Sequence, residues 1–167
     1  MRLFMLMLLP LLSIFVQSAF FSFYGLKGSF PDVLLIFVAF YALMNKSLPA
    51  TAYGMLCGLL EDLYVGSMIG SNVIAKGATA YVISRLQVQV FKENLLVGVL
   101  GVFIASMVNA AIILLISLAV KKNLYLDTAL LTVMGYHILY NMLLSVPAYL
   151  IYYNSSRYGW LMPVRKD

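Results

Sequence analysis

The sequence predicts an all-α polytopic membrane protein with six transmembrane helices. Of its 167 residues, 63% are hydrophobic and only 10% are charged, whereas a soluble domain carries about a quarter charged residues. The apolar residues fall into long runs, several of about 20 residues, which is the length that an α-helix needs to cross a bilayer. The formal charge of +5 comes mostly from residues near the ends of these runs. It therefore indicates membrane topology rather than a nucleic-acid partner.

The first predicted span covers residues 3–23, with Pro10 as an expected kink. Arg2 followed by a long apolar run is also the pattern of a cleavable signal peptide. We favour a retained span, because the run continues through aromatic residues to Tyr24 and many further spans follow.

The second span, residues 31–44, is short. It would measure roughly 21 Å at 1.5 Å per residue, less than a hydrocarbon core of about 30 Å. The stretch NKSLP, residues 45–49, predicts a tight turn before a third span at 49–64. The alternative is that the second and third spans form one long broken helix.

Three further spans are expected at residues 69–88, 94–120 and 128–153, the last with Pro147 as a kink. Residues 1–153 would then form a single transmembrane domain, and 154–167 a polar tail.

Six spans place both termini on one side of the membrane, and the basic residues favour the cytoplasm for that side. Its segments would hold Arg2, Lys46, Arg85, Lys92, Arg157, Arg165 and Lys166. The external segments would hold Lys27, Lys121 and Lys122. The sequence therefore predicts a multi-pass protein of the bacterial inner membrane with cytoplasmic termini and a cytoplasmic tail.

Three charged residues lie close to the turn of the hairpin that the predicted third and fourth spans form. Glu61 and Asp62 precede its turn, and Lys76 lies about two helical turns after it. A lone charge deep in a bilayer costs a few kcal/mol, so we expect Lys76 to neutralise a carboxylate and stiffen the hairpin. Asp62 should point into the bundle and is the expected partner, whereas Glu61, 100° away, should reach the interface. The alternative is a proton or substrate site.

Small and polar residues surround these charges. Gly54 and Gly58, four apart on the third span, should let another helix approach closely. In the turn, Gly66 and Gly70 permit positive φ. Side chains expected to cap the helix ends there are those of Ser67, Ser71 and Asn72.

A second group of polar residues lies along one face of the sixth span. His137, Asn141 and Ser145 are spaced four apart, and Asn109 and Ser106 on the fifth span could face them. We expect hydrogen bonds between the helices, and a ligand pocket is the alternative. No nucleophile with a base, phosphate-binding loop or metal-ligand set stands out. We therefore expect no catalytic residue, cofactor or metal.

The sequences of the second span and of the hairpin resemble those of a known protein family. PDVLLIFVAFYAL in the second span and GMLCGLLEDLYVGSMIGSNVIAKGATAYV in the hairpin closely resemble the bacterial rod shape-determining protein MreD family. The family pattern G-x-x-x-G-L-x-x-D-x-x-x-G-x-x-x-G-x-N-x-x-x-K maps onto Gly54, Gly58, Leu59, Asp62, Gly66, Gly70, Asn72 and Lys76, with Pro31 and Asp32 before it.

This resemblance implies a non-enzymatic scaffold of the cell-elongation machinery. Its partners would be the transmembrane helix of MreC, membrane lipid and, directly or indirectly, MreB and the RodA and penicillin-binding transpeptidase complex for peptidoglycan synthesis. The fold would resemble the substrate-binding subunits of energy-coupling-factor vitamin transporters. Such a transporter subunit is the competing function, although Ser18 and Ser22 alone provide small residues four apart in the first span. A small membrane enzyme is a third class, without a supporting constellation.

Overall fold

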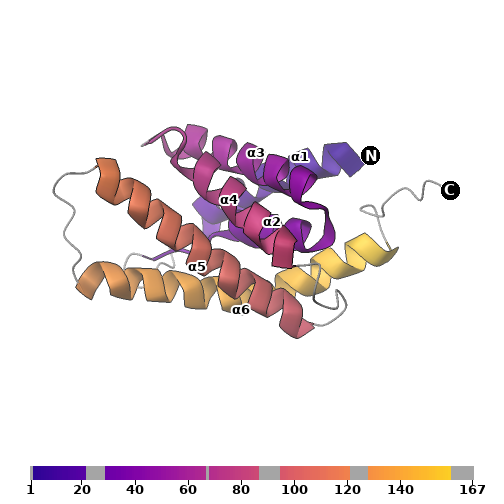
Figure 1. The fold of residues 1–167 in the computed structure, drawn as a ribbon. Helices are drawn as coiled ribbons and strands as arrows, with labels where there is room; N and C mark the ends of the chain where they lie inside the picture. The colour runs from indigo at the N-terminus through magenta and orange to yellow at the C-terminus, as the bar shows by residue number, and fades with distance from the viewer. Residues whose placement is uncertain (1, 22–28, 67, 87–94, 121–127, 159–167) are drawn as a thin grey trace.

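The chain folds as a bundle of helices (Figure 1). The computed structural model describes residues 2–21, 29–66, 68–86, 95–120 and 128–158. The elements in order are α1 (Arg2–Val16), the π-helical turn η1 (Gln17–Phe21), α2 (Val33–Met44), α3 (Ser47–Val65), α4 (Ser71–Leu86), α5 (Leu95–Val120) and α6 (Thr128–Tyr158). The prediction of an all-α fold with six α-helices is therefore confirmed in the described part of the chain.

Consecutive helices run in alternating directions. In Figure 1 the α3–α4 hairpin covers one side of α2, and α5 and α6 cover the other. One cavity is lined by residues near the ends of α3 and α5, by the first residue of η1, and by residues at the beginnings of α2, α4 and α6. We call this end of the bundle the hairpin end. The helix α1 begins and α6 ends at the opposite end (Figure 1), so both termini of the helical bundle point the same way.

Helix α2 is the core of the bundle rather than a helix facing lipid. It contacts each of the other α-helices, and Leu34, Leu35, Ile36 and Val38 are fully buried. At 12 residues it is about 18 Å long. It is therefore too short to cross a hydrocarbon core of about 30 Å.

Within the described ranges, two helical segments are long and apolar enough to cross a membrane: Leu95–Val120 and Leu130–Ile151. The segments Leu8–Ala19 and Val33–Met44 are apolar but shorter. The described residues thus form six α-helices, whereas six complete membrane crossings stay a prediction.

The helix boundaries agree with the predicted runs at most ends. Helices α2 and α3 are separate, because Asn45 and Lys46 between them have extended backbone with ψ of 160° and 158°. Helix α3 begins earlier than predicted, so that Pro49 lies in its first turn, where proline is tolerated. Helix α6 continues past the predicted end at residue 153 to Tyr158, with Pro147 inside it.

Glycines bring α3 and α4 into backbone contact. A Cβ added at Gly54 would lie 2.6 Å from the Lys76 carbonyl oxygen and 2.8 Å from Ala80 Cβ. A Cβ at Gly58 would collide with the backbone of Asn72. Neither position has space for a methyl group, so the two glycines set the distance between the helices and hence the depth of Lys76.

This packing predicts opposite effects of the same substitution at two glycines. Gly58→Ala should destabilise the protein by about 1–3 kcal/mol, because backbone atoms must move. Gly135→Ala is the matched control: it lies on α6 with nothing within 4 Å of the added Cβ, and should be neutral or stabilising by up to about 1 kcal/mol. Thermal unfolding in detergent measures both. Equal effects would show that α3 and α4 are not in backbone contact.

Candidate functional site

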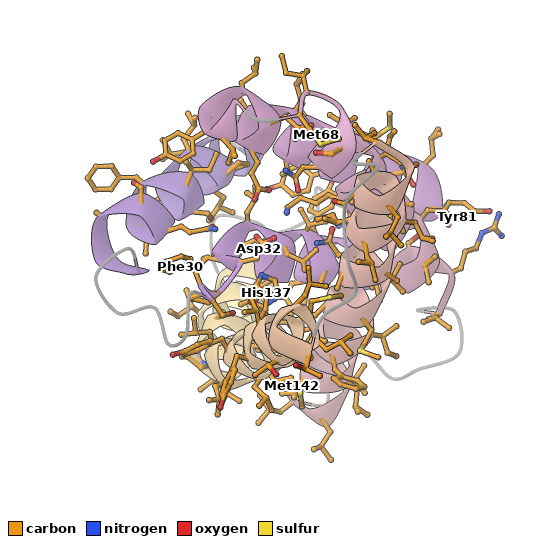
Figure 2. The ribbon with its side chains drawn as sticks, turned by 90° about the vertical axis from the view of Figure 1, so that its left-hand side faces the viewer. Phe30, Asp32, Met68, Tyr81, His137 and Met142 are labelled. Carbon is orange, nitrogen blue, oxygen red and sulfur yellow. The ribbon has the colours of Figure 1, made fainter. Side chains whose placement is uncertain are left out.

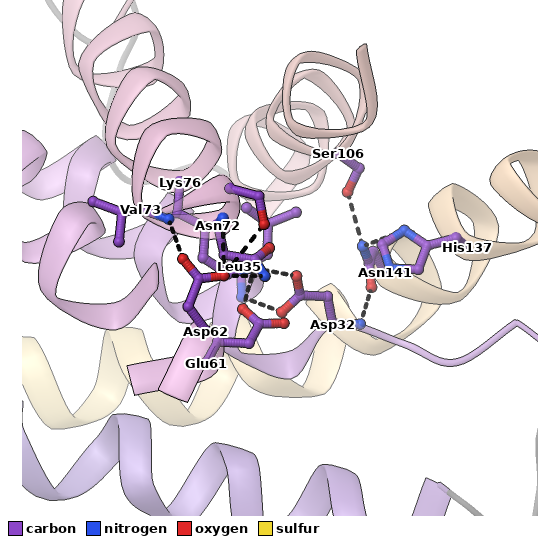
Figure 3. A network of polar contacts seen from close by, with 11 residues as sticks. Asp32, Leu35, Glu61, Asp62, Asn72, Val73, Lys76, Ser106, His137 and Asn141 are labelled. Atoms are coloured by element: carbon purple, nitrogen blue, oxygen red, sulfur yellow. Dashed lines mark hydrogen bonds and ion pairs between the residues drawn. The ribbon is translucent and has the colours of Figure 1, made fainter. Parts of the chain in front are cut away.

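A buried lysine pairs with two carboxylates near the hairpin end. Lys76 on α4 is fully buried, and its Nζ lies 2.6 Å from Asp32 Oδ2 and 2.6 Å from Glu61 Oε2 (Figure 3). The two carboxylate side chains are only 6% and 15% exposed. We call these three residues the ionic triad. It joins the beginning of α2 to α3 and α4, and leaves one formal negative charge.

Two expectations about this cluster are wrong. Lys76 pairs with Glu61 and Asp32 rather than with Asp62, and Glu61 lies in the triad instead of reaching the interface. The angle of 100° between Glu61 and Asp62 does place their side chains on different faces of α3. Both side chains are nevertheless mostly buried at this end of the helix. Asp32 was missed as a partner. Its place at the beginning of the short, apolar second span was the available signal, because that span starts at the hairpin end.

Asp32 has three roles at the beginning of α2. Its Oδ1 accepts a hydrogen bond from Leu35 N at 2.8 Å, which caps the helix. Its Oδ2 binds Lys76. Its own backbone N–H donates to Asn141 Oδ1 at 2.8 Å, which attaches this end of α2 to α6.

Asp62 caps α4 from the neighbouring helix. Its carboxylate accepts hydrogen bonds from the backbone N–H groups of Gly70, Asn72 and Val73, at 2.8–3.2 Å, and from the Asn72 side chain at 3.0 Å (Figure 3). A carboxylate at a helix N-terminus satisfies free N–H groups and interacts favourably with the helix dipole. Asp62 is therefore held by the turn and not by Lys76.

The expected caps from Ser71 and Asn72 are consequently wrong. Ser71 Oγ donates to the carbonyl of Met68 at 2.8 Å and lies 3.3 Å from an Asp62 oxygen. The Asn72 side chain is a donor to Asp62, so neither side chain accepts from the first turn of α4. Ser67 lies outside the described residues.

The two turn glycines adopt the left-handed backbone that the sequence predicted. Gly66 has φ of +68° and ends α3, with its N–H donating to the Asp62 carbonyl at 2.9 Å. Gly70 has φ of +104° and donates to the Asp62 carboxylate. Both conformations are strained for residues with a side chain.

Asn141 is the centre of the second polar group. Its Nδ2 donates to Ser106 Oγ on α5 at 3.0 Å and lies 3.4 Å from His137 Nδ1. Because its Oδ1 is engaged by the Asp32 N–H, Nδ2 is the atom that faces His137. Donation from Asn141 then places the proton of a neutral imidazole on Nε2.

The remaining residues of the second polar group make different contacts. Ser145 is buried but donates to the Met142 carbonyl of its own helix at 2.6 Å. Asn109 is 2% exposed, and its Oδ1 has no hydrogen-bond partner in the described part of the chain. Asn141, His137 and Ser106 are thus brought together, whereas Ser145 turns to its own helix and Asn109 Oδ1 is left without a partner.

A cavity of about 440 Å³ lies at the hairpin end. Figure 2 looks at this end of the molecule, with Asp32 and His137 near the middle. The polar lining of the cavity includes Asp32, Glu61, Asn72, Asn109 and His137, and its apolar lining comes from α5 and α6. The volume falls within the range of small-molecule sites. Two residues of the ionic triad, Asp32 and Glu61, and two of the second polar group, His137 and Asn109, therefore border one space.

These features define a helical membrane protein whose few internal charges join its helices. The chain belongs to the MreD family: the family model described as rod shape-determining protein MreD matches residues 1–157. It is thus a membrane protein with a role in rod shape determination. No curated protein and no solved structure matches the chain, so the expected likeness to transporter subunits stays a prediction.

Double-mutant cycles should separate the true partners of Lys76 from the expected one. Lys76→Met should cost about 3–5 kcal/mol, because two carboxylates lose their buried cation. Adding Glu61→Gln should recover part of the loss, with a coupling energy of about 1–3 kcal/mol. Adding Asp62→Asn is the matched control and should give additive losses. Unfolding in detergent measures the cycle, and strong coupling to Asp62 would contradict the ionic triad.

The cap predicts a local effect of Asp62→Ala. Loss of the carboxylate leaves the N–H groups of the α3–α4 turn unpaired and should destabilise the protein by about 1–3 kcal/mol. Amide hydrogen exchange should accelerate at Asn72 and Val73, while the amides of α6 keep their relative protection. Ser71→Ala is the control and should have a small effect. Unchanged exchange at the beginning of α4 would show that Asp62 is not the cap.

Proposed function

We propose that this chain is a non-enzymatic scaffold of the cell-elongation machinery that binds the transmembrane helix of MreC. Through MreC it would help to organise peptidoglycan synthesis with MreB, RodA and the penicillin-binding transpeptidase. The observation that carries the proposal is the family match over residues 1–157. A family of shape-determining proteins acts through assembly, and MreC is the single-span partner that the resemblance implies.

The distribution of polar and apolar groups supports a binding role. The carboxylates of Asp32 and Asp62 are engaged by Lys76 and by the turn of the hairpin, respectively. The outer surface of α5 and α6 is apolar, with Leu100, Leu115 and Leu139 more than half exposed. Such a surface contacts either lipid or another apolar helix.

The alternating helices support the proposed topology. The helical bundle begins and ends at the same end (Figure 1), as expected if residues 1–153 form one multi-pass domain of the inner membrane. With both termini and a tail at 154–167 in the cytoplasm, the hairpin end would face the periplasm. The ionic triad would then lie near the outer interface.

A substrate-binding subunit of an energy-coupling-factor type transporter is the second candidate. The cavity at the hairpin end favours it, because the volume and mixed lining suit a small molecule. If this candidate is right, the chain would share with such subunits both the number of helices and the binding of a small-molecule substrate. The small-residue motif for a coupling subunit is weak in the first helix, which carries Phe15 close to Ser18.

Photo-crosslinking in the source bacterium tests both candidates. A photoreactive amino acid at Leu115 or Leu139 should crosslink MreC, because both side chains face outward. Val102 is the control: it is fully buried on α5 and should give no intermolecular product. Purification of the tagged chain should recover MreC with the wall-synthesis enzymes. Recovery of an ATPase and a coupling subunit without MreC would instead establish the transporter function.

A further inference from the structure

The cavity at the hairpin end combines an excess negative charge with an unused acceptor. Glu61 and Asp32 line the cavity, and they share the single positive charge of Lys76. The ionic triad therefore keeps one formal negative charge. A buried charge without a counterion is costly, so this space favours either a proton on Glu61 or a second cation.

Asn109 provides an independent indication of a ligand. Its side chain is almost completely buried and lines the cavity, yet its Oδ1 has no hydrogen-bond partner in the described ranges. An unsatisfied buried acceptor costs about 1–3 kcal/mol, and nearly all such groups in folded proteins have a partner. Because Asn109 lines the cavity, a donor bound there could supply the missing hydrogen bond.

The rest of the lining determines the shape of the ligand. Ile113, Leu114, Leu130 and Val133 border the cavity from α5 and α6. Asn72 and Asn141 are already engaged by Asp62 and by Asp32 with Ser106. The Asn109 acceptor and the two carboxylates lie at one side of the cavity. The other polar lining residues are Gln17, Ser117 and His137, and the rest of the wall is apolar.

We propose that this cavity binds a primary ammonium group carried by an apolar body. The ammonium would donate to Asn109 Oδ1 and neutralise the excess charge at Glu61, and the apolar part would lie against α5 and α6. Two sources have this chemistry: the aminoethyl headgroup of a phospholipid and a free amphiphilic amine. The inference is independent of MreC binding, which we assign to the outer surface.

Ligand-induced stabilisation of the full chain in an uncharged maltoside detergent tests the proposal. The probes are 2-phenylethylamine with its uncharged analogue 2-phenylethanol, and dihexanoyl phosphatidylethanolamine with dihexanoyl phosphatidylglycerol. At about 100 times its dissociation constant a specific ligand should raise Tm by about 5 °C. We expect this from at least one amine and from neither amine-free analogue. Stabilisation by phosphatidylethanolamine alone identifies the lipid headgroup as the source.

Asn109→Leu is the decisive variant. It should raise the Tm of the unliganded protein by about 2 °C, because it removes an unpartnered buried acceptor, and should abolish the amine-induced shift. Glu61→Gln should weaken amine binding at least tenfold. Asn45→Ala is the matched control: Asn45 bonds to the Tyr41 carbonyl at the opposite end of α2, and the variant should keep the full shift.

Three results would overturn the proposal. They are the absence of a shift with every amine, equal shifts with the amine-free analogues, and a full shift in Asn109→Leu. The failure of the proposal would leave the MreC crosslinking result unaffected, so the two can be judged separately.

Discussion

The buried ammonium of Lys76 is the constraint on which the arrangement of the core depends. An ammonium removed from water is tolerated only when opposite charges surround it closely. Asp32 and Glu61 provide them, from α2 and α3. To bring these atoms within 2.6 Å of Nζ, the beginning of α2 must lie beside the α3–α4 hairpin. The core helix is therefore positioned along its axis by charge, while its apolar side chains fill the space around it.

The same constraint extends through hydrogen bonds to the other half of the bundle. Asp32 is bound to Lys76 through its side chain and to Asn141 through its backbone. Asn141 in turn bonds to Ser106 on α5. A continuous polar path thus joins α4, α2, α6 and α5. Within a bilayer, where apolar packing gives little directional preference, such a path specifies which helices meet and at what depth.

This arrangement has a consequence for the proposed scaffold function. A partner helix that docks on the outer surface of α5 and α6 meets helices whose positions are linked to the charged core. The cavity lies between the α3–α4 hairpin on one side and α5 and α6 on the other. It is bordered by Asp32 and Glu61 of the triad and by Asn109. Occupation of that cavity would therefore act on both halves. The proposed docking surface and the proposed ligand site are different parts of the bundle, and the polar path links the helices that carry them.

The sequence could predict the helical class, most helix boundaries and the two glycine pairs, because apolar runs, glycine spacing and turn residues are local signals. Gly54 and Gly58 needed only their spacing to indicate close packing, and Gly66 and Gly70 only their place in a turn. Local signals could also predict that Glu61, Asp62 and Lys76 lie close together in the hairpin. They could not assign the partners, because a pairing depends on how three helices are rotated and placed in depth.

Only the tertiary structure decided that Asp62 caps α4, that Lys76 binds Asp32 across 44 residues of sequence, and that α2 is enclosed instead of facing lipid. The cavity and the unpartnered Asn109 are likewise products of packing. In this chain, then, the sequence alone determined where helices form and where charges must be hidden. The tertiary structure decided which charges meet, because in the interior a charge is stabilised by whatever group the fold brings within reach.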